Sequence, residues 1–544
     1  MDSAPIPEAG QASLTGTGKP VTPIWSPLKI KVFRALFLAS VASNIGTWMH
    51  DISAAWLMTS LAPSPLMVAL VQAAATFPLF LFILPAGALA DILNRRHMLL
   101  LTHLWMILAA LALSILTYLG ATSPVTLLLC IFALAIGVAF TNPAWQAIIP
   151  DIVPRNEIPS AIALGSIGFN LARSVGPALG GLLVASLGPA FVFLLNSISY
   201  VGIAIVLYGW KTEKPESALP PDSIFNAIRV GFRHVIYSRG MVAVLIKGGA
   251  FILGASAMWA VLPLYVKQDL HLSSLHYGML IGALGLGAVF GGTALSRLRS
   301  KFSVDRVVNR LLIVYALFTL ALAYFTNFYV LCLLMFIGGI AWMIMLSSYN
   351  IASQLSLPAW VRARGLSLYT MVFFGGLSIG SALWGLLAEY TGIPLTLVIS
   401  AAVLLLGLLF SRRFNLAYSE TINLTVSKHW PTPQVIEEPE PDEGPVVINV
   451  EYRINPTDKK DFLFAMKELF ISRKRTGAYR WALYNDLSDP DKYIESFILP
   501  SWIEHMRQFE RLTEHEKEIE EKVSRFHIGN DPPKVKHLLF IKDY

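Results

Sequence analysis

The sequence predicts an all-α membrane protein with twelve transmembrane helices in two pseudo-symmetric six-helix halves, followed by a C-terminal ferredoxin-like α+β domain. Three observations carry this prediction. Hydrophobic residues make up 55% of the 544 residues, which is more apolar surface than a soluble protein of this size buries. One stretch of the chain recurs 204 residues later. The last 99 residues hold 34 of the 77 charged residues, so a soluble domain follows the membrane body.

The recurring stretch aligns without a gap. Pro154 precedes the sequence GPALGGLL at 176–183, and Pro358 precedes GSALWGLL at 380–387. Two parallel repeats around a central cavity are a common construction of secondary transporters. The repeat therefore indicates a protein that carries a molecule across a bilayer rather than one that transforms it.

Apolar runs of about 20 residues match the thickness of a hydrocarbon core. The predicted spans lie near 33–58, 66–90, 97–119, 124–148, 160–186, 189–209, 240–265, 274–297, 305–326, 328–352, 363–388 and 393–411. Basic residues gather in the loops after even-numbered spans, whereas the loops after odd-numbered spans carry essentially only Lys267. The positive-inside rule then makes both termini cytoplasmic.

Six segments follow from these boundaries. They are a disordered cytoplasmic N-terminus (1–32), an N-terminal transport half (33–209), a cytoplasmic linker with an amphipathic helix (210–239), a C-terminal transport half (240–411), a Pro-rich linker (412–445) and the soluble domain (446–544). The Pro-rich linker is expected to be extended and mobile. In the last segment, alternating apolar residues at 446–454 start a β-α-β-β-α-β order, which is ferredoxin-like. Because both helices would cover one sheet face, we expect a homodimer or a docking contact through 446–544.

Arg173 is the strongest single candidate for a functional residue, because it falls near the middle of the fifth span. A buried arginine needs a partner or a water-filled cavity. Asn170 lies one turn earlier on the same face, and Asp51 is the carboxylate placed best to exchange protons and to pair with Arg173. The alternatives are an ion pair that only locks two helices, and an Asp51 that is solvated at the mouth of the protein.

Two further motifs predict a conformational latch. Gly87, Asp91, Arg95 and Arg96 lie at the cytoplasmic end of the second span, where Asp91 can pair with an arginine or cap a neighbouring helix. The fifth span contains small residues and a proline that allow bending and close packing, namely Gly176, Pro177, Gly180 and Gly181. The alternative is that both motifs serve only topology and packing.

The sequence also excludes several functions. It shows no phosphate-binding Walker loop, no nucleophile elbow and no Cys/His metal cluster, so we expect no cofactor, no metal and no enzymatic activity. The net charge of +7 is explained by loop arginines, so no nucleic acid is expected as a partner. Cys130 and Cys332 are expected to be free thiols.

With these residues in hand, the chain resembles the major facilitator superfamily. The stretch from Gly87 to Arg96 looks like its loop signature, and the stretch from Gly176 to Gly181 looks like its exporter signature. The sequences NIGTW at 44–48 and AWLMTS at 55–60 resemble the enterobactin-exporter-like transmembrane secretion effector branch. The tail is similar to antibiotic-biosynthesis-monooxygenase-like modules. The fourth span lacks the arginine of many proton antiporters, which makes Arg173 a candidate substitute.

The resemblance implies a multi-pass protein of the bacterial plasma (inner) membrane that exports a small molecule in exchange for protons. We assign Asp51 and Arg173 to proton coupling, and we expect the substrate cavity to include Asn44, Trp48, Asn170, Trp145 and Trp259. Uptake instead of export stays open. So does a catalytic tail, in which Trp502 and His505 would be the site residues.

Overall fold

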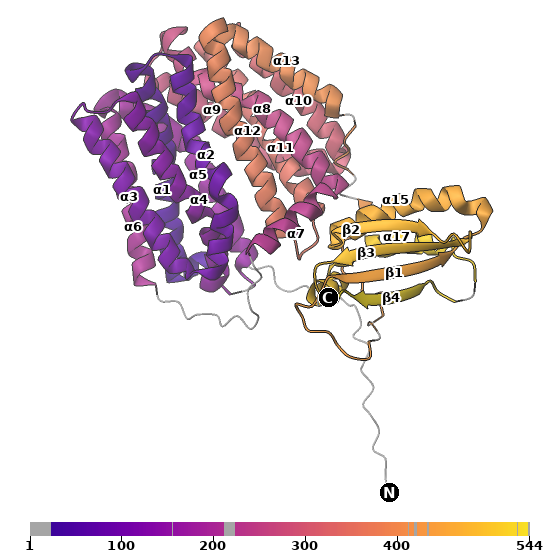
Figure 1. Ribbon diagram of the computed structural model, residues 1–544. Coiled ribbons are helices and arrows are strands. Elements are labelled where there is room, and N and C mark those ends of the chain that lie inside the picture. The colour runs from indigo at the N-terminus through magenta and orange to yellow at the C-terminus, as the bar shows by residue number, and fades with distance from the viewer. Residues whose placement is uncertain are drawn as a thin grey trace.

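The computed structural model describes residues 23–154, 156–210, 224–411, 413–417, 421–431, 433, 435–529 and 531–541. It shows a body of long helices beside a small α+β domain, the tail (residues 446–541) (Figure 1). The predicted N-terminus up to residue 22, most of the linker before 224 and the side chain of Asp91 lie outside the described parts.

The helices of the body follow the predicted spans in order. The first half contains α1 (Lys31–Leu61), α2 (Pro65–Ile92), α3 (Arg95–Tyr118), α4 (Pro124–Ile152), α5 (Ile158–Leu187) and α6 (Pro189–Gly209). The second half contains α8 (Arg239–Gln268), α9 (Ser274–Lys301), α10 (Val304–Leu322), α11 (Phe328–Leu355), α12 (Arg362–Thr391) and α13 (Ile393–Ser411). The short helix α7 (Ile224–Ile236) precedes the second half, where the amphipathic helix was predicted.

Within the described residues, ten of these helices are long and apolar enough to cross a membrane. The other two differ from the prediction in detail. Helix α13 is apolar over the shorter stretch Ile393–Leu409, and α10 begins with the charged residues Asp305, Arg306 and Arg310. The architecture is therefore that of a mostly helical multi-pass membrane protein.

We call the end of the body where α1, α3 and α5 begin and where α7 lies the tail-side end, and the opposite end the far end. The ends of the first half are fixed by hydrogen bonds at helix termini. Ser26 of the short 3-10 helix η1 (Ser26–Lys29) donates to Glu157 just before α5 at 2.7 Å. Arg96 at the start of α3 donates from Nε to the carbonyl of Leu207 near the end of α6 at 2.8 Å.

The sequence repeat corresponds to a repeat of contacts. A Cβ atom on Gly176 would collide with Trp48 of α1, and one on Gly380 would collide with Ser256 of α8, so both glycines let helices of the same half approach closely. The glycines five positions later, Gly181 and Gly385, instead face the other half. The offset of 204 residues thus preserves which neighbour each glycine meets, as expected for two structurally equivalent halves.

The tail has a four-stranded antiparallel sheet. Its elements are β1 (Val446–Arg453), η2 (Pro456–Asp458), α15 (Lys459–Thr476), β2 (Arg480–Asn485), β3 (Lys492–Leu499), α16 (Trp502–Arg511), α17 (Glu514–Ser524) and β4 (Lys534–Leu539). The strands lie in the order β2-β3-β1-β4, with Val450 of β1 opposite Glu495 of β3 and Val535 of β4. Alternate residues of β1 and β3 are buried against α15 and α17. These strand and helix residues together form the core of the tail.

The tail region differs from the predicted order and linker in two ways. After α16 ends at Arg511, Thr513 begins an additional helix with a capping box to Glu516. The Pro-rich linker is not extended and mobile throughout. Its residues 423–427 pair with the backbone at 512–515, and Trp430 Nε1 donates to Glu520 Oε2 at 2.7 Å.

Candidate functional site between the two halves

The halves are sealed against each other at the far end. Gly181 of α5 packs against Ser274 and Gly278 of α9, where a side chain on either glycine would meet backbone atoms. Three of the side-chain hydrogen bonds that join the halves there are Ser274 Oγ to the carbonyl of Gly181 at 3.1 Å, Ser64 Oγ to Glu389 Oε2 at 2.6 Å, and Lys267 Nζ to Ser60 Oγ at 2.6 Å. Solvent therefore has no direct route between α5 and α9 at this end.

The seam between α5 and α9 ends at Arg173. The carbonyl of Arg173 lies against Gly285 of α9, and this is the last close glycine contact between the two helices on the way to the tail-side end. Nearer that end, Gly165 of α5 has no atom within 4 Å of its Cβ position, and Phe169 is 46% exposed. The two helices therefore separate just on the tail side of Arg173.

Arg173 itself is buried but unpaired. Its side chain retains 9% exposure, its Nε has no hydrogen-bond partner, and no carboxylate among the described residues forms an ion pair with it. Its guanidinium carbon lies 5.8 Å from the centroid of the Trp48 ring of α1. A cation–π contact of this kind offsets only part of the cost of burying the charge.

Asp51 does not pair with Arg173, contrary to our expectation. Asp51 is an exposed residue of α1, and within the described chain it has no hydrogen bond and no ion pair. Its neighbour His50 is buried instead, and its ring packs on Phe193 of α6 at a centroid distance of 4.7 Å. The two predicted coupling residues therefore lie on neighbouring helices as separate, unpaired charges.

The predicted cavity residues divide into two groups. Trp48 and Asn170 lie beside Arg173, with Asn170 Nδ2 donating to the carbonyl of Ser166 at 2.8 Å, and Asn44 is half-buried one turn before Trp48 on α1. Trp259 belongs to the second half, where its ring packs on Trp342 and its buried Nε1 is unpartnered.

Trp145 is different. It is half-buried and packs against a cluster of the first half formed by α1, α2, α3, α4 and α6, away from Arg173 in the sequence and without a described contact to Trp48 or Trp259. Sequence alone could not separate these cases, because every one of these side chains lies in an apolar helix.

The predicted latch makes its described contacts within one half. Arg95 forms an ion pair with Asp151 of α4 at 3.0 Å, and Arg96 donates to carbonyls at the end of α6. The Cβ position of Gly87 has no atom within 4 Å. Gly176 and Gly180 contact α1 in the same half, and only Pro177 and Gly181 reach the other half, at Gly278. Among the predicted latch residues, the described contacts with the other half are thus those of Pro177 and Gly181.

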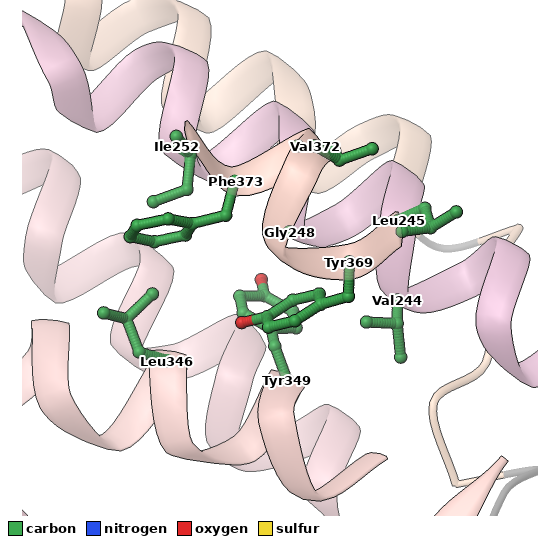
Figure 2. A pocket seen from close by; sticks show the side chains of 10 residues that line it. Val244, Leu245, Gly248, Ile252, Leu346, Tyr349, Tyr369, Val372 and Phe373 are labelled. Atoms are coloured by element: carbon green, nitrogen blue, oxygen red, sulfur yellow. The ribbon is translucent and has the colours of Figure 1, made fainter. Parts of the chain in front are cut away.

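A narrow pocket, too small in this state to hold a water molecule, lies between α8, α11 and α12 in the second half. Figure 2 shows Tyr349 and Tyr369 pointing into its middle, beside Gly248 and Phe373. The two phenol rings fill most of the space between the three helices. Neither tyrosine was predicted from the sequence. The one feature that could have indicated them is a phenol hydroxyl in an otherwise apolar helix.

Comparison with known proteins decides the family. The sequence profile described as "Transmembrane secretion effector", a family of MFS type, matches residues 22–543, which is nearly the whole chain and includes the tail. The chain belongs to this family.

Curated proteins similar to this transmembrane secretion effector are transporters. The "Multidrug efflux pump Tap" of Mycolicibacterium fortuitum is 23% identical over 386 residues, covering 68% of this chain and 93% of its own length. The "Enterobactin exporter EntS" of Salmonella typhimurium is 26% identical, covering 69% and 89%. The "Uncharacterized MFS-type transporter YceJ" of Bacillus subtilis is 26% identical, covering 58% and 78%.

Solved structures agree on the fold of the transmembrane secretion effector. A bacterial homologue of the lysosomal transporter Spinster, in an inward-facing and unoccupied conformation, matches with a TM-score of 0.56 at 15% identity, covering 72% of this chain and 98% of its own. A bacterial homologue of ferroportin, in an inward-facing state, matches with a TM-score of 0.57 at 15% identity, covering 70% and 98%. The chain is a multi-pass membrane transporter of the major facilitator type.

One buried ion pair of this transporter was not anticipated. Lys247 of α8 is buried and lies 2.5 Å from Asp305 of α10. Asp305 also accepts hydrogen bonds from the backbone N–H groups of Leu416 and Ala417 after α13, at 3.2 and 2.9 Å. This carboxylate therefore ties together two helices and the exit of the chain toward the tail.

Proposed function

We propose that this secondary transporter exports a small molecule in exchange for protons, by alternating access between its two halves. The observation that carries the proposal is the asymmetric closure of the body. The far end is sealed by Gly181, Gly278 and three hydrogen bonds, while α5 and α9 separate on the tail side of Arg173. With both termini cytoplasmic and twelve spans, as the loop charges predict, this is an inward-facing state ready to load cargo from the cytoplasm.

Asp51 suits the role of proton carrier in this scheme. It is the exposed carboxylate of α1, three residues from the Trp48 ring that covers Arg173. A carboxylate without an ion-pair partner can gain and lose a proton as the two halves alternate its surroundings. The names of the relatives, an efflux pump and an exporter, support export as the direction.

The test is proton release from everted vesicles that contain the full chain. Addition of a panel of antibiotics, dyes and siderophores should collapse the pH gradient in the wild type, and Asp51→Asn should abolish this flux while it leaves membrane insertion unchanged. Asp269→Asn is the matched control, because Asp269 is an exposed carboxylate directly after α8 and lies outside the contacts between the halves described above. A substrate-driven flux that survives in Asp51→Asn would remove Asp51 from the coupling mechanism.

We assign the tail to the ferredoxin-like class and propose that it regulates the transporter. Its strand order β2-β3-β1-β4 supports the class, and its contacts with the body support the role. Arg233 of α7 donates to the carbonyl of Gly477 at 2.5 Å, and His234 Nδ1 lies 3.3 Å from the carbonyl of Arg475. Arg511 of the tail stacks on Trp360, just before α12, at 5.0 Å.

The regulatory role is tested by Arg233→Ala, with exposed Arg229→Ala on the same helix as the control. Release of the tail should change the transport rate in the first variant only. Equal rates in both variants and in the wild type would leave the tail without influence on transport. Dimerisation through 446–544 would be a separate function, measured by the mass of the detergent-solubilised protein.

A further inference from the structure

Several buried hydrogen-bond donors of the helical body have no acceptor in the described part of the chain, among them Arg173 Nε, Trp259 Nε1 and the hydroxyl of Tyr315. Arg173 and Tyr315 lie within electrostatic range of each other although they belong to different halves. A buried donor without an acceptor destabilises the protein, and a buried cation without one does so more strongly.

The surroundings of Arg173 are aromatic. Trp48 covers its guanidinium, and the Phe169 ring lies 6.5 Å from that of Trp48. Tyr315 and Trp259 both contact Trp342 in the second half, with centroid distances of 6.0 and 5.7 Å. Aromatic rings of this kind bind flat apolar groups by stacking.

Arg173 also lies where the open and the closed parts of the contact between α5 and α9 meet. On its far side α5 and α9 are in backbone contact, and on its tail side α5 exposes Gly165 and Phe169. A molecule that enters from the tail-side end therefore stops at this residue. A guanidinium at such a stop recognises planar oxyanions through two parallel hydrogen bonds.

We propose that Arg173 is the binding site for an anionic group, a carboxylate or a similar delocalised oxyanion, on an aromatic substrate. This inference rests on the proposed transport function and names the substrate class of the same site. Arg173 then acts as a substrate ligand, and Trp48 stacks on the ring of the bound molecule. The anion supplies the acceptor oxygens that the protein itself does not provide.

The test is equilibrium binding to the purified full chain in nanodiscs, without any gradient. Three probes share one ring system and differ in charge: 2-naphthoate, 2-naphthamide and 2-naphthylmethylamine. Quenching of tryptophan fluorescence gives each affinity. A charge-assisted bidentate contact predicts that naphthoate binds about tenfold to a hundredfold more tightly than naphthamide.

Variants then locate the preference. Arg173→Gln should reduce the ratio of naphthoate to naphthamide affinity to about one. Arg173→Lys should keep part of this preference, because lysine retains the positive charge but not the two parallel N–H donors of the guanidinium. Arg310→Gln, an exposed arginine on α10, should leave the ratio unchanged. An unchanged ratio in Arg173→Gln would overturn the proposal. If that variant does not fold, the wild-type charge series decides, and equal affinities for the three probes would overturn it.

A rival role is an ion pair with Asp51 in another conformation. In that case Asp51→Asn would restore the stability or activity that Arg173→Gln loses, and naphthoate would show no preference, which contradicts the proposal. Failure of the two proposals can be told apart. A chain that binds the anion but moves nothing contradicts transport alone, and a chain that transports without anion preference contradicts the site alone.

Discussion

Gly181 of α5 and Gly278 of α9 meet backbone to backbone, and Ser274 closes the same contact with a hydrogen bond of 3.1 Å to the Gly181 carbonyl. No side chain stands between the halves at this point. Opening of the far end must therefore separate two backbones, and any side chain introduced there prevents their return.

Gly181→Leu should hold the far end open. The added side chain collides with backbone atoms of α9 that cannot yield cheaply, so the sealed state is lost. In a background without Cys130 and Cys332, a cysteine at Ser64 should react several-fold faster with a membrane-impermeant maleimide. Gly202→Leu is the control, because the Cβ position of Gly202 has no atom within 4 Å. Unchanged labelling in Gly181→Leu would mean that the seam does not govern access.

Removal of Asp305 should destabilise the protein much more than removal of Lys247. Without Asp305, the side chain of Lys247, which is 3% exposed, keeps an uncompensated charge, a change that costs about 3–5 kcal/mol. Without Lys247, Asp305 retains two backbone donors and 22% exposure. Thermal unfolding of Asp305→Ala and Lys247→Met in detergent measures the difference, and equal losses would contradict this asymmetry.

Docking of the tail should weaken in acid. Burial, together with the charges of Arg475 and Arg511, lowers the pKa of His234 to about 3, while a released histidine titrates near 6.5. Between these values the released form binds a proton that the docked form does not, so docking loses up to about tenfold per pH unit below 6.5.

The fluorine resonance of 5-fluorotryptophan at position 360, assigned by Trp360→Phe, reports this release because Trp360 contacts both His234 and Arg511. The control is His234→Gln, which keeps a donor for the Arg475 carbonyl and does not titrate. A pH response that persists in the control would place the switch elsewhere.

Glu520 should hold the linker on the tail. Burial would raise its pKa, but the charge of Arg473 and the bonds from His429 and Trp430 lower the pKa below the usual range, so it stays ionised near neutral pH. Glu520→Gln should weaken this anchor by about 1.5–3 kcal/mol and expose residues 423–431 to protease. The exposed neighbour variant Glu521→Gln should be cleaved like the wild type. Because the pKa of Glu520 is lowered, acid should release the linker only at a pH below the usual pKa range of glutamate.

Periodicity and repetition predicted the helices, the two halves and the order of the strands, because these depend on local patterns. They did not predict which side chains meet across helices. Lys247 and Asp305 are 58 positions apart, and Arg95 meets Asp151, not a partner in the other half. Such pairs depend on the rotation of each helix about its axis, which a uniformly apolar sequence does not specify. The same uncertainty explains why the expected pair of Asp51 and Arg173 is not formed.

The tail contacts α7, the helix that precedes the second half, and Trp360 ahead of α12. It should therefore move together with the second half. When the two halves rock against each other, the distance between the tail and the start of α5 then changes. Fluorescence energy transfer between one dye on the tail and one at the start of α5 would report each transport cycle.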